Sequence, residues 1–228
     1  MELINFFLRP EYVAEKVEKS TIKHNFKKVF QGLVFGIKGI LVAAGIFGIF
    51  HWCLGVNMPV KNTGMKQLYH VNYFLAIALL IAPICEEIQD RLYLNLKKTS
   101  LFISLIFTGI WFLIPLYKVN EWDEKYLLIL VLIIIVSFFL SRILILKPKF
   151  FKYYFWFSVT WFAFSHIFNY HLIKPIDYIL IPLWVLPQFS YGIALGYIRV
   201  NCGILWSIAL HIFINTLAFF PEILKYFR

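Results

Sequence analysis

Charged residues are scarce in this chain, and acidic residues are the scarcest of them. Asp, Glu, Lys and Arg make up 15% of the 228 residues, against about 25% in soluble globular domains. The three cysteines, Cys53, Cys85 and Cys202, have no paired spacing, so they support neither a disulfide framework nor a cysteine-based zinc site. Internal repeats and low-complexity tracts are also lacking. These absences argue against a disulfide-stabilised secreted scaffold, a repeat array and an ordinary soluble domain.

Apolar residues fill the sequence instead. Hydrophobic residues make up 61% and aromatic residues 20% of the chain, a composition typical of a polytopic membrane protein. A spanning helix needs about 20 mostly apolar residues. The sequence therefore predicts an all-α transmembrane helical bundle of about seven spans, or six or eight if one boundary shifts. The candidate segments are 33–56, 71–94, 101–117, 126–146, 153–172, 177–198 and 202–220.

The distribution of basic residues between these segments predicts an orientation. The N-terminal segment 1–28 is rich in lysine, and Lys97, Lys98 and Arg142 follow on the same predicted side. The other side has fewer basic residues, and acids dilute their charge. We place the basic side and the N-terminus in the cytoplasm, in an integral, multi-pass protein of the cell membrane. This bias, together with attraction to the lipid bilayer, explains the net charge of +10 without a nucleic-acid partner.

The chain divides into two parts by composition. Residues 1–28 form a basic segment that is cytoplasmic or lies on the membrane surface, and residues 29–228 form a single membrane domain. Within the basic segment, residues 11–28 are either a surface helix with Val13 and Val17 turned toward lipid or a solvated lead-in.

A cluster of charges interrupts the apolar pattern in ICEEIQDR, residues 84–91. Glu87 and Arg91 are four residues apart with the acid first, the favourable order for an ion pair within a helix. Glu86 points about 100° away from Glu87, on another flank of the helix. The simpler alternative is that the whole cluster lies at a wet helix end.

Two further pairs stand four residues apart in apolar segments: Phe162 with His166, and His211 with Asn215. Each spacing puts both members on one helix face. Taken singly, each pair also fits a structural role, as a hydrogen-bonding histidine or as packing between helices. Together with Glu86 they supply a base for water, a histidine that orients it and two donors for an oxyanion, which is a complete hydrolytic set.

The three motifs, in this order, resemble the CPBP (Abi) family of intramembrane proteases, relatives of the CAAX prenyl endopeptidases. EEIQDR (86–91) fits EExxxR, FAFSH (162–166) fits FxxxH, and HIFIN (211–215) fits HxxxN, within a core of about 71–220. The resemblance implies a glutamic endopeptidase that cleaves a peptide or membrane-protein substrate without a cofactor. In it Glu86 and His166 activate water, His211 and Asn215 form the oxyanion hole, and Glu87, Arg91 and Phe162 support them. Zinc held by Glu86, His166 and His211 is the less favoured alternative.

The sequence departs from the family pattern on both sides of Arg91. Asp90 stands where an aromatic residue is usual, and Leu92 where glycine is usual. These departures indicate either a diverged substrate or a member that no longer cleaves. The second hypothesis is therefore a non-catalytic CPBP-like protein that acts in bacteriocin self-immunity or as a scaffold. An ion or proton transporter ranks last, because the proline breaks at Pro175, Pro182 and Pro187 fall in one segment only.

Overall fold

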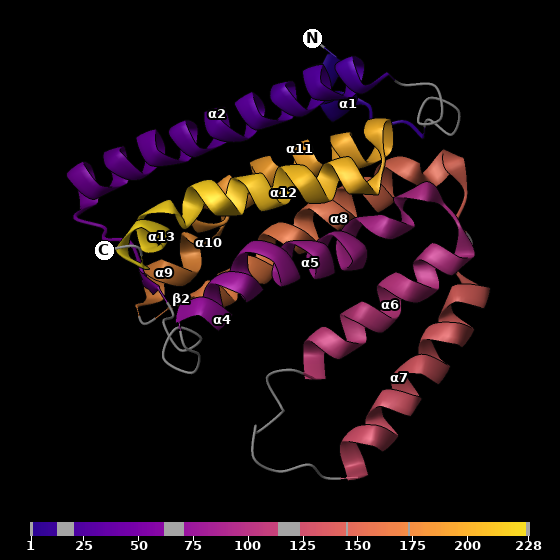
Figure 1. The fold of residues 1–228 in the computed structure, drawn as a ribbon. Coiled ribbons are helices and arrows are strands. Elements are labelled where there is room, and N and C mark those ends of the chain that lie inside the picture. Colours follow the sequence, from indigo (N-terminus) through magenta and orange to yellow (C-terminus); the bar gives the residue numbers. More distant parts are fainter. Residues whose placement is uncertain are drawn as a thin grey trace.

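The fold is almost entirely helical, which confirms the prediction of an all-α protein (Figure 1). The computed structural model describes residues 2–12, 21–61, 71–113, 124–144, 146–172 and 174–226. Its strands are two residues long: β1 (Val60–Lys61) pairs antiparallel with β2 (Tyr170–His171).

The N-terminal part consists of a short helix and a very long one. The short helix α1 (Glu2–Leu8) buries Leu3 in the core. The long helix α2 (Ile22–Leu54) begins after Thr21, whose hydroxyl accepts a hydrogen bond from the backbone N–H of His24, and ends at Gly55. Because α2 starts at residue 22, it includes the end of the basic segment, and the side chain of Lys28 is buried. Residues 13–20, which include Val13 and Val17, lie outside the described residues.

The predicted second span, 71–94, is interrupted. It consists of α4 (Val71–Ala76), the π-helical turn η1 (Ile77–Ile81), α5 (Ala82–Arg91) and the 3-10 turn η2 (Leu92–Asn95). Pro83 has no N–H to donate to the carbonyl of Leu79, so the regular ladder of hydrogen bonds cannot continue through this point. The wider π turn lies next to that break.

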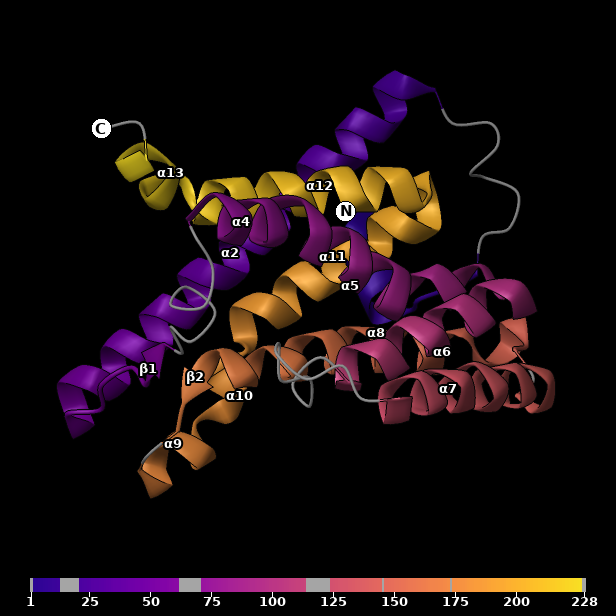
Figure 2. The same ribbon diagram turned by 60° about the horizontal axis from the view of Figure 1, so that its bottom comes forward.

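The middle of the chain forms two neighbouring antiparallel helices followed by a third. The helices α6 (Lys98–Leu113) and α7 (Glu124–Ile143) lie side by side at one edge of the molecule (Figure 2). The turn η4 (Pro148–Phe150) then leads into α8 (Phe151–Ser165), and α8 ends in the 3-10 turn η5 (His166–Asn169).

The C-terminal part holds three proline-started helices and two further ones. The breaks predicted at the prolines of the candidate span 177–198 are confirmed, because the chain there forms α9 (Pro175–Ile179), α10 (Ile181–Trp184) and α11 (Leu186–Cys202). Each carries a proline in its first turn, where the missing N–H has no intrahelical partner to lose. Gly203, with φ of 96°, joins α11 directly to α12 (Ile204–Ala218), and α13 (Phe220–Tyr226) follows.

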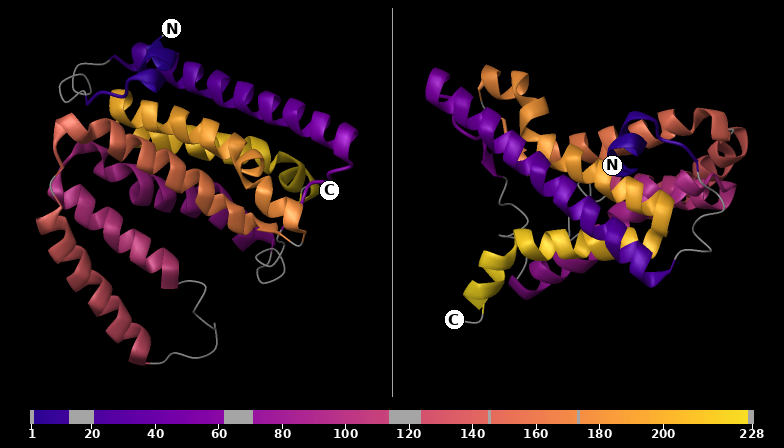
Figure 3. Two further views of the ribbon diagram at one scale, coloured as in Figure 1. Left: turned by 180° about the vertical axis from the view of Figure 1, so that it is seen from behind. Right: turned by 90° about the horizontal axis from the view of Figure 1, so that it is seen from above.

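The core is built around α11. Its residues from Gly192 to Cys202 are all buried, and the helix packs against α2, α8 and α12 (Figure 3). Small residues allow the close approach to α2, since a Cβ on Gly39 would lie 2.2 Å from Cβ of Ser190. The core cluster includes Phe151, Phe155, Phe162, Tyr197 and Leu210.

Helix length supports fewer membrane spans than the seven predicted. Among the described residues, α2 alone is long and apolar enough to cross a membrane, and the pair 127–143 and 148–169 passes only if these two helices, bent by 105°, form one broken span. The π turn divides the candidate 71–94 and the prolines divide the candidate 177–198, whereas α6 and α12 are apolar but shorter than 18 residues. The loop charges used for the orientation, at Lys66, Lys118, Glu121 and Asp123, lie outside the described residues.

Candidate functional site

Three helices bring the predicted polar residues together. Helix α5, which carries ICEEIQDR, contacts both α8 and α12, and the three lie next to one another in the centre of Figure 1. His166 is the first residue of η5, at the end of α8, and His211 lies in the middle of α12. Residues separated by up to about half of the sequence therefore share one site.

Glu86 faces both histidines. Its Oε2 lies 3.9 Å from Nε2 of His166 and 3.6 Å from Nε2 of His211. The side chains of Glu86 and His166 are 18% and 20% exposed, whereas that of His211 is 4% exposed. Both distances exceed direct hydrogen-bonding length, and a separation of this size is one that a water molecule can bridge.

The hydrogen bond made by the other ring nitrogen fixes the tautomer of His166. Nδ1 of His166 lies 2.7 Å from the carbonyl oxygen of Phe162, one turn earlier. Because a carbonyl only accepts, Nδ1 carries the proton in this bond. Nε2, on the side of Glu86, is then the unprotonated nitrogen of the neutral ring and can accept a hydrogen bond.

Glu87 is the centre of a fully buried network. Its Oε1 accepts from Nη1 of Arg91 at 2.6 Å and lies 2.9 Å from Nδ1 of His211, and its Oε2 accepts from the hydroxyl of Ser207 at 2.5 Å. The side chains of Glu87 and Arg91 are both 0% exposed. The predicted ion pair is therefore present, and the cluster is not a wet helix end. The network thereby also holds in place His211, which is a neighbour of Glu86.

Phe162 supports the two histidines and the arginine. Its ring meets that of His166 at 4.6 Å and that of His211 at 5.6 Å between centroids, both edge to face. The guanidinium carbon of Arg91 lies 4.2 Å from the same ring centroid, a cation–π contact. This one aromatic side chain thus limits the orientation of three polar groups.

Asn215 lies one turn after His211 and is held by the π turn. Its Nδ2 donates to the carbonyl oxygen of Ala78 at 2.9 Å. This bond ties α12 to the interrupted segment 77–81. Since a side-chain amide has two N–H donors, one remains for another acceptor.

The sequence reasoning missed Ser207 and Arg199. Ser207 precedes His211 by four residues, so Ser207, His211 and Asn215 form one stripe with a spacing of four, a signal that the sequence contained. Arg199 donates to the carbonyls of Arg91 and Leu92, at 3.1 and 3.0 Å, and so satisfies the end of α5. No sequence pattern pointed to that contact, because it joins residues more than 100 positions apart.

No group of three His, Cys, Asp or Glu side chains is arranged to hold a metal ion within the ranges that the structure describes. Zinc at Glu86, His166 and His211 stays a prediction, as does its absence. Comparison of the chain with protein-family models, with curated proteins and with solved structures gives no match.

Proposed function

We propose that this protein is an intramembrane endopeptidase of the CPBP type that hydrolyses a peptide bond in a membrane-delivered peptide or protein. The observation that carries the proposal is the approach of Glu86 to His166 and His211, at 3.9 and 3.6 Å, from three separate helices. A carboxylate that meets two imidazoles beside a buried ion pair is the arrangement that activation of water requires.

In the proposed reaction, Glu86 takes a proton from a water molecule that is held between its carboxylate and Nε2 of His166. The water oxygen forms a bond to the carbonyl carbon of the scissile peptide, and the π electrons move onto the carbonyl oxygen. When the C–N bond breaks, Glu86 returns the proton to the leaving amine. The carboxylate is thereby regenerated, and the products are a carboxylic acid and an amine.

His211 and Asn215 stabilise the oxyanion in this proposal. Nδ1 of His211 donates to Glu87, so Nε2 donates as well only when the ring is an imidazolium. Asn215 supplies the amide N–H that its bond to Ala78 leaves over. Two such donors in a site shielded from water are the usual oxyanion arrangement.

The surface of the molecule supports association with a membrane, and the multi-pass arrangement with a cytoplasmic N-terminus is part of the proposal. Helix α2 is long and apolar enough to span a bilayer. Large apolar side chains on α7, among them Leu127, Leu128, Phe139 and Ile143, are exposed. Because contiguous apolar patches of this kind are rare on soluble monomers, lipid is their natural environment.

The test is cleavage of a peptide library in proteoliposomes that contain the purified chain. Each peptide bears an apolar anchor segment, and products are identified by mass spectrometry. Removal of a general base costs roughly 10²–10⁴-fold in rate, so Glu86→Gln and His166→Ala are each expected to lose at least that much. Glu11→Gln changes an exposed acid and serves as the matched control. Full activity in both site variants would end the proposal.

One observation favours the second candidate, a non-catalytic membrane protein in self-immunity or scaffolding. Asn215 already donates to Ala78, and Glu87 is fully occupied by its partners, so the polar residues also serve to hold helices together. If that is their whole role, Glu86→Gln keeps the cellular phenotype, whereas Arg91→Met weakens the phenotype because it destabilises the fold.

A further inference from the structure

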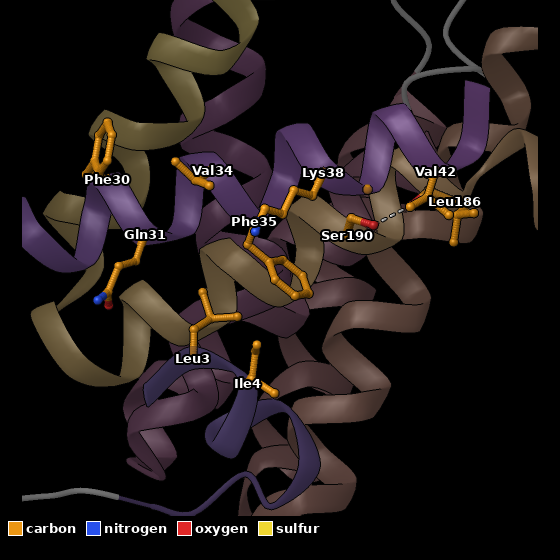
Figure 4. Close-up of a pocket in the computed structure, with 11 residues that line it drawn as sticks. Leu3, Ile4, Phe30, Gln31, Val34, Phe35, Lys38, Val42, Leu186 and Ser190 are labelled. Atoms are coloured by element: carbon orange, nitrogen blue, oxygen red, sulfur yellow. Dashed lines mark hydrogen bonds between the residues drawn. The ribbon is translucent and has the colours of Figure 1, made fainter. Parts of the chain in front are cut away.

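Two cavities open between helices in the described part of the chain. The one shown in Figure 4 has a volume of about 480 Å³ and lies between α1, α2 and α11. The only charged side chain in its lining, that of Lys38, is exposed, and the hydroxyl of Ser190 donates to the carbonyl of Leu186. Its lining therefore offers no deeply buried charge to select a ligand.

The second cavity, of about 440 Å³, lies between α5, η2, α6 and α8. Its volume is in the range of roughly 300–1,000 Å³ that is usual for small-molecule sites. Most of the wall is apolar or aromatic, including Leu101, Leu105, Phe157 and Trp161. It is lined by neither Glu86 nor the two site histidines, so it is separate from the candidate catalytic site.

Most polar groups in this wall are already hydrogen-bonded to backbone carbonyls. The hydroxyl of Ser104 donates to Ile88 at 2.7 Å, and that of Thr108 donates to Ser104 at 2.9 Å. The hydroxyl of Tyr93 donates to Tyr154 at 3.4 Å. None of these donors is turned toward a ligand in the cavity.

Asp90 is different. The residue is among those that line the cavity, it is 3% exposed, and its Oδ1 has no hydrogen-bond partner among the described residues. Gln89, which also lines the cavity, interacts with the same carboxyl group. A buried carboxylate requires a partner, preferably a cationic one, because burial removes its hydration.

The local charge also favours a cation. Glu86, Glu87 and Asp90 bring three carboxyl groups to α5, and the guanidinium groups that reach this helix are those of Arg91 and Arg199. Arg91 donates to Glu87, and Arg199 donates to backbone carbonyls. The carboxyl groups on α5 therefore outnumber these two guanidinium groups by one.

We infer that this second cavity binds an amphiphile with one apolar chain and a primary ammonium head, and that the ammonium donates to the carboxyl group of Asp90. The apolar wall accepts the chain, and the buried carboxylate selects the head. The inference is independent of the proposed peptidase activity.

The experiment uses an alkylamine that carries a photoactivatable diazirine near the end of its chain, added to the purified full chain in lipid nanodiscs. We expect saturable labelling at Leu101, Leu105, Phe157 and Trp161, mapped by mass spectrometry and displaced by unlabelled dodecylamine. Loss of a hydrogen bond to a charged group weakens binding by at least about tenfold, so Asp90→Asn is expected to lose that much. Glu2→Gln, which removes a carboxyl group on α1, is the matched control and keeps full labelling.

Three results would overturn the inference. Labelling that does not saturate and spreads over the exposed face of α7 shows partition into lipid only. Equal labelling of the native protein and Asp90→Asn shows that the carboxyl does not select the head, as does equal displacement by dodecanol. If Asp90→Asn does not fold, the variant Leu105→Trp is used in its place, because the larger side chain fills the cavity. Saturable labelling that persists in Leu105→Trp would also overturn the inference.

Discussion

The pair of Glu87 and Arg91 is buried completely, so its charges can be removed singly and together. The substitutions are Glu87→Gln, which is isosteric, and Arg91→Met, which keeps an unbranched apolar side chain; they are made as two single variants and one double variant. Both side chains are 0% exposed, and Nη1 lies 2.6 Å from Oε1. Each single variant leaves one buried charge without its opposite, whereas the double variant leaves neither.

The geometry sets the expected size of the effects. Two unit charges 2.6 Å apart attract by about 6 kcal/mol at an effective dielectric of 20, and the desolvation of each ion offsets several kcal/mol of this. Removing one partner of a buried pair costs about 3–5 kcal/mol. The double variant avoids the unpaired charge, so its loss is expected to fall short of the summed single losses by about 2–3 kcal/mol.

The assay is equilibrium unfolding of the purified chain in mixed micelles titrated with SDS, followed by tryptophan fluorescence and circular dichroism. Arg9→Met is the control, because Arg9 is exposed and such a change is expected to stay within about 0.5 kcal/mol. Single losses below about 1 kcal/mol would contradict the burial of the pair. A double loss equal to the sum of the single losses would show that the two charges do not interact.

Three other outcomes can be measured on the same protein. Gly39→Ala puts a Cβ 2.2 Å from Cβ of Ser190 and is expected to lower the free energy of unfolding by about 1–3 kcal/mol through overpacking. Its control, Gly45→Ala, meets nothing within 4 Å and is expected to be neutral or stabilising. Equal unfolding curves for the two variants would contradict the packing of α2 on α11. Ser207→Ala removes a hydrogen bond to the buried carboxylate of Glu87 and is expected to lower the free energy of unfolding by about 1.5–3 kcal/mol. A smaller loss is expected for the control Ser141→Ala, because that hydroxyl donates within its own helix. Equal losses would contradict the hydrogen-bond network around Glu87. The peptidase activity is expected to persist in excess chelator, with elemental analysis finding well below one zinc per chain; one equivalent of zinc and chelator-sensitive activity would instead establish the metal mechanism.

The sequence by itself determined the helical class and the helix faces that carry the polar residues. Apolar composition alone predicts helices, and a spacing of four alone puts Glu87 beside Arg91, as the structure has them. The same spacing could not count the spans. Pro83 and the prolines in the first turns of α9, α10 and α11 interrupt the hydrogen-bond ladder, and a composition window does not register such breaks.

Only the tertiary structure decided what these faces meet. Three features depend on how α5, α6, α8 and α12 pack. They are the approach of Glu86 to His166 and His211, the hydrogen bond from Ser207 to Glu87, and the place of Asp90 at the border of a cavity. The physical reason is the range of the interactions involved. A helix fixes the positions of residues within a turn or two of one another, whereas contacts between helices arise from side-chain packing that no local pattern in the chain encodes.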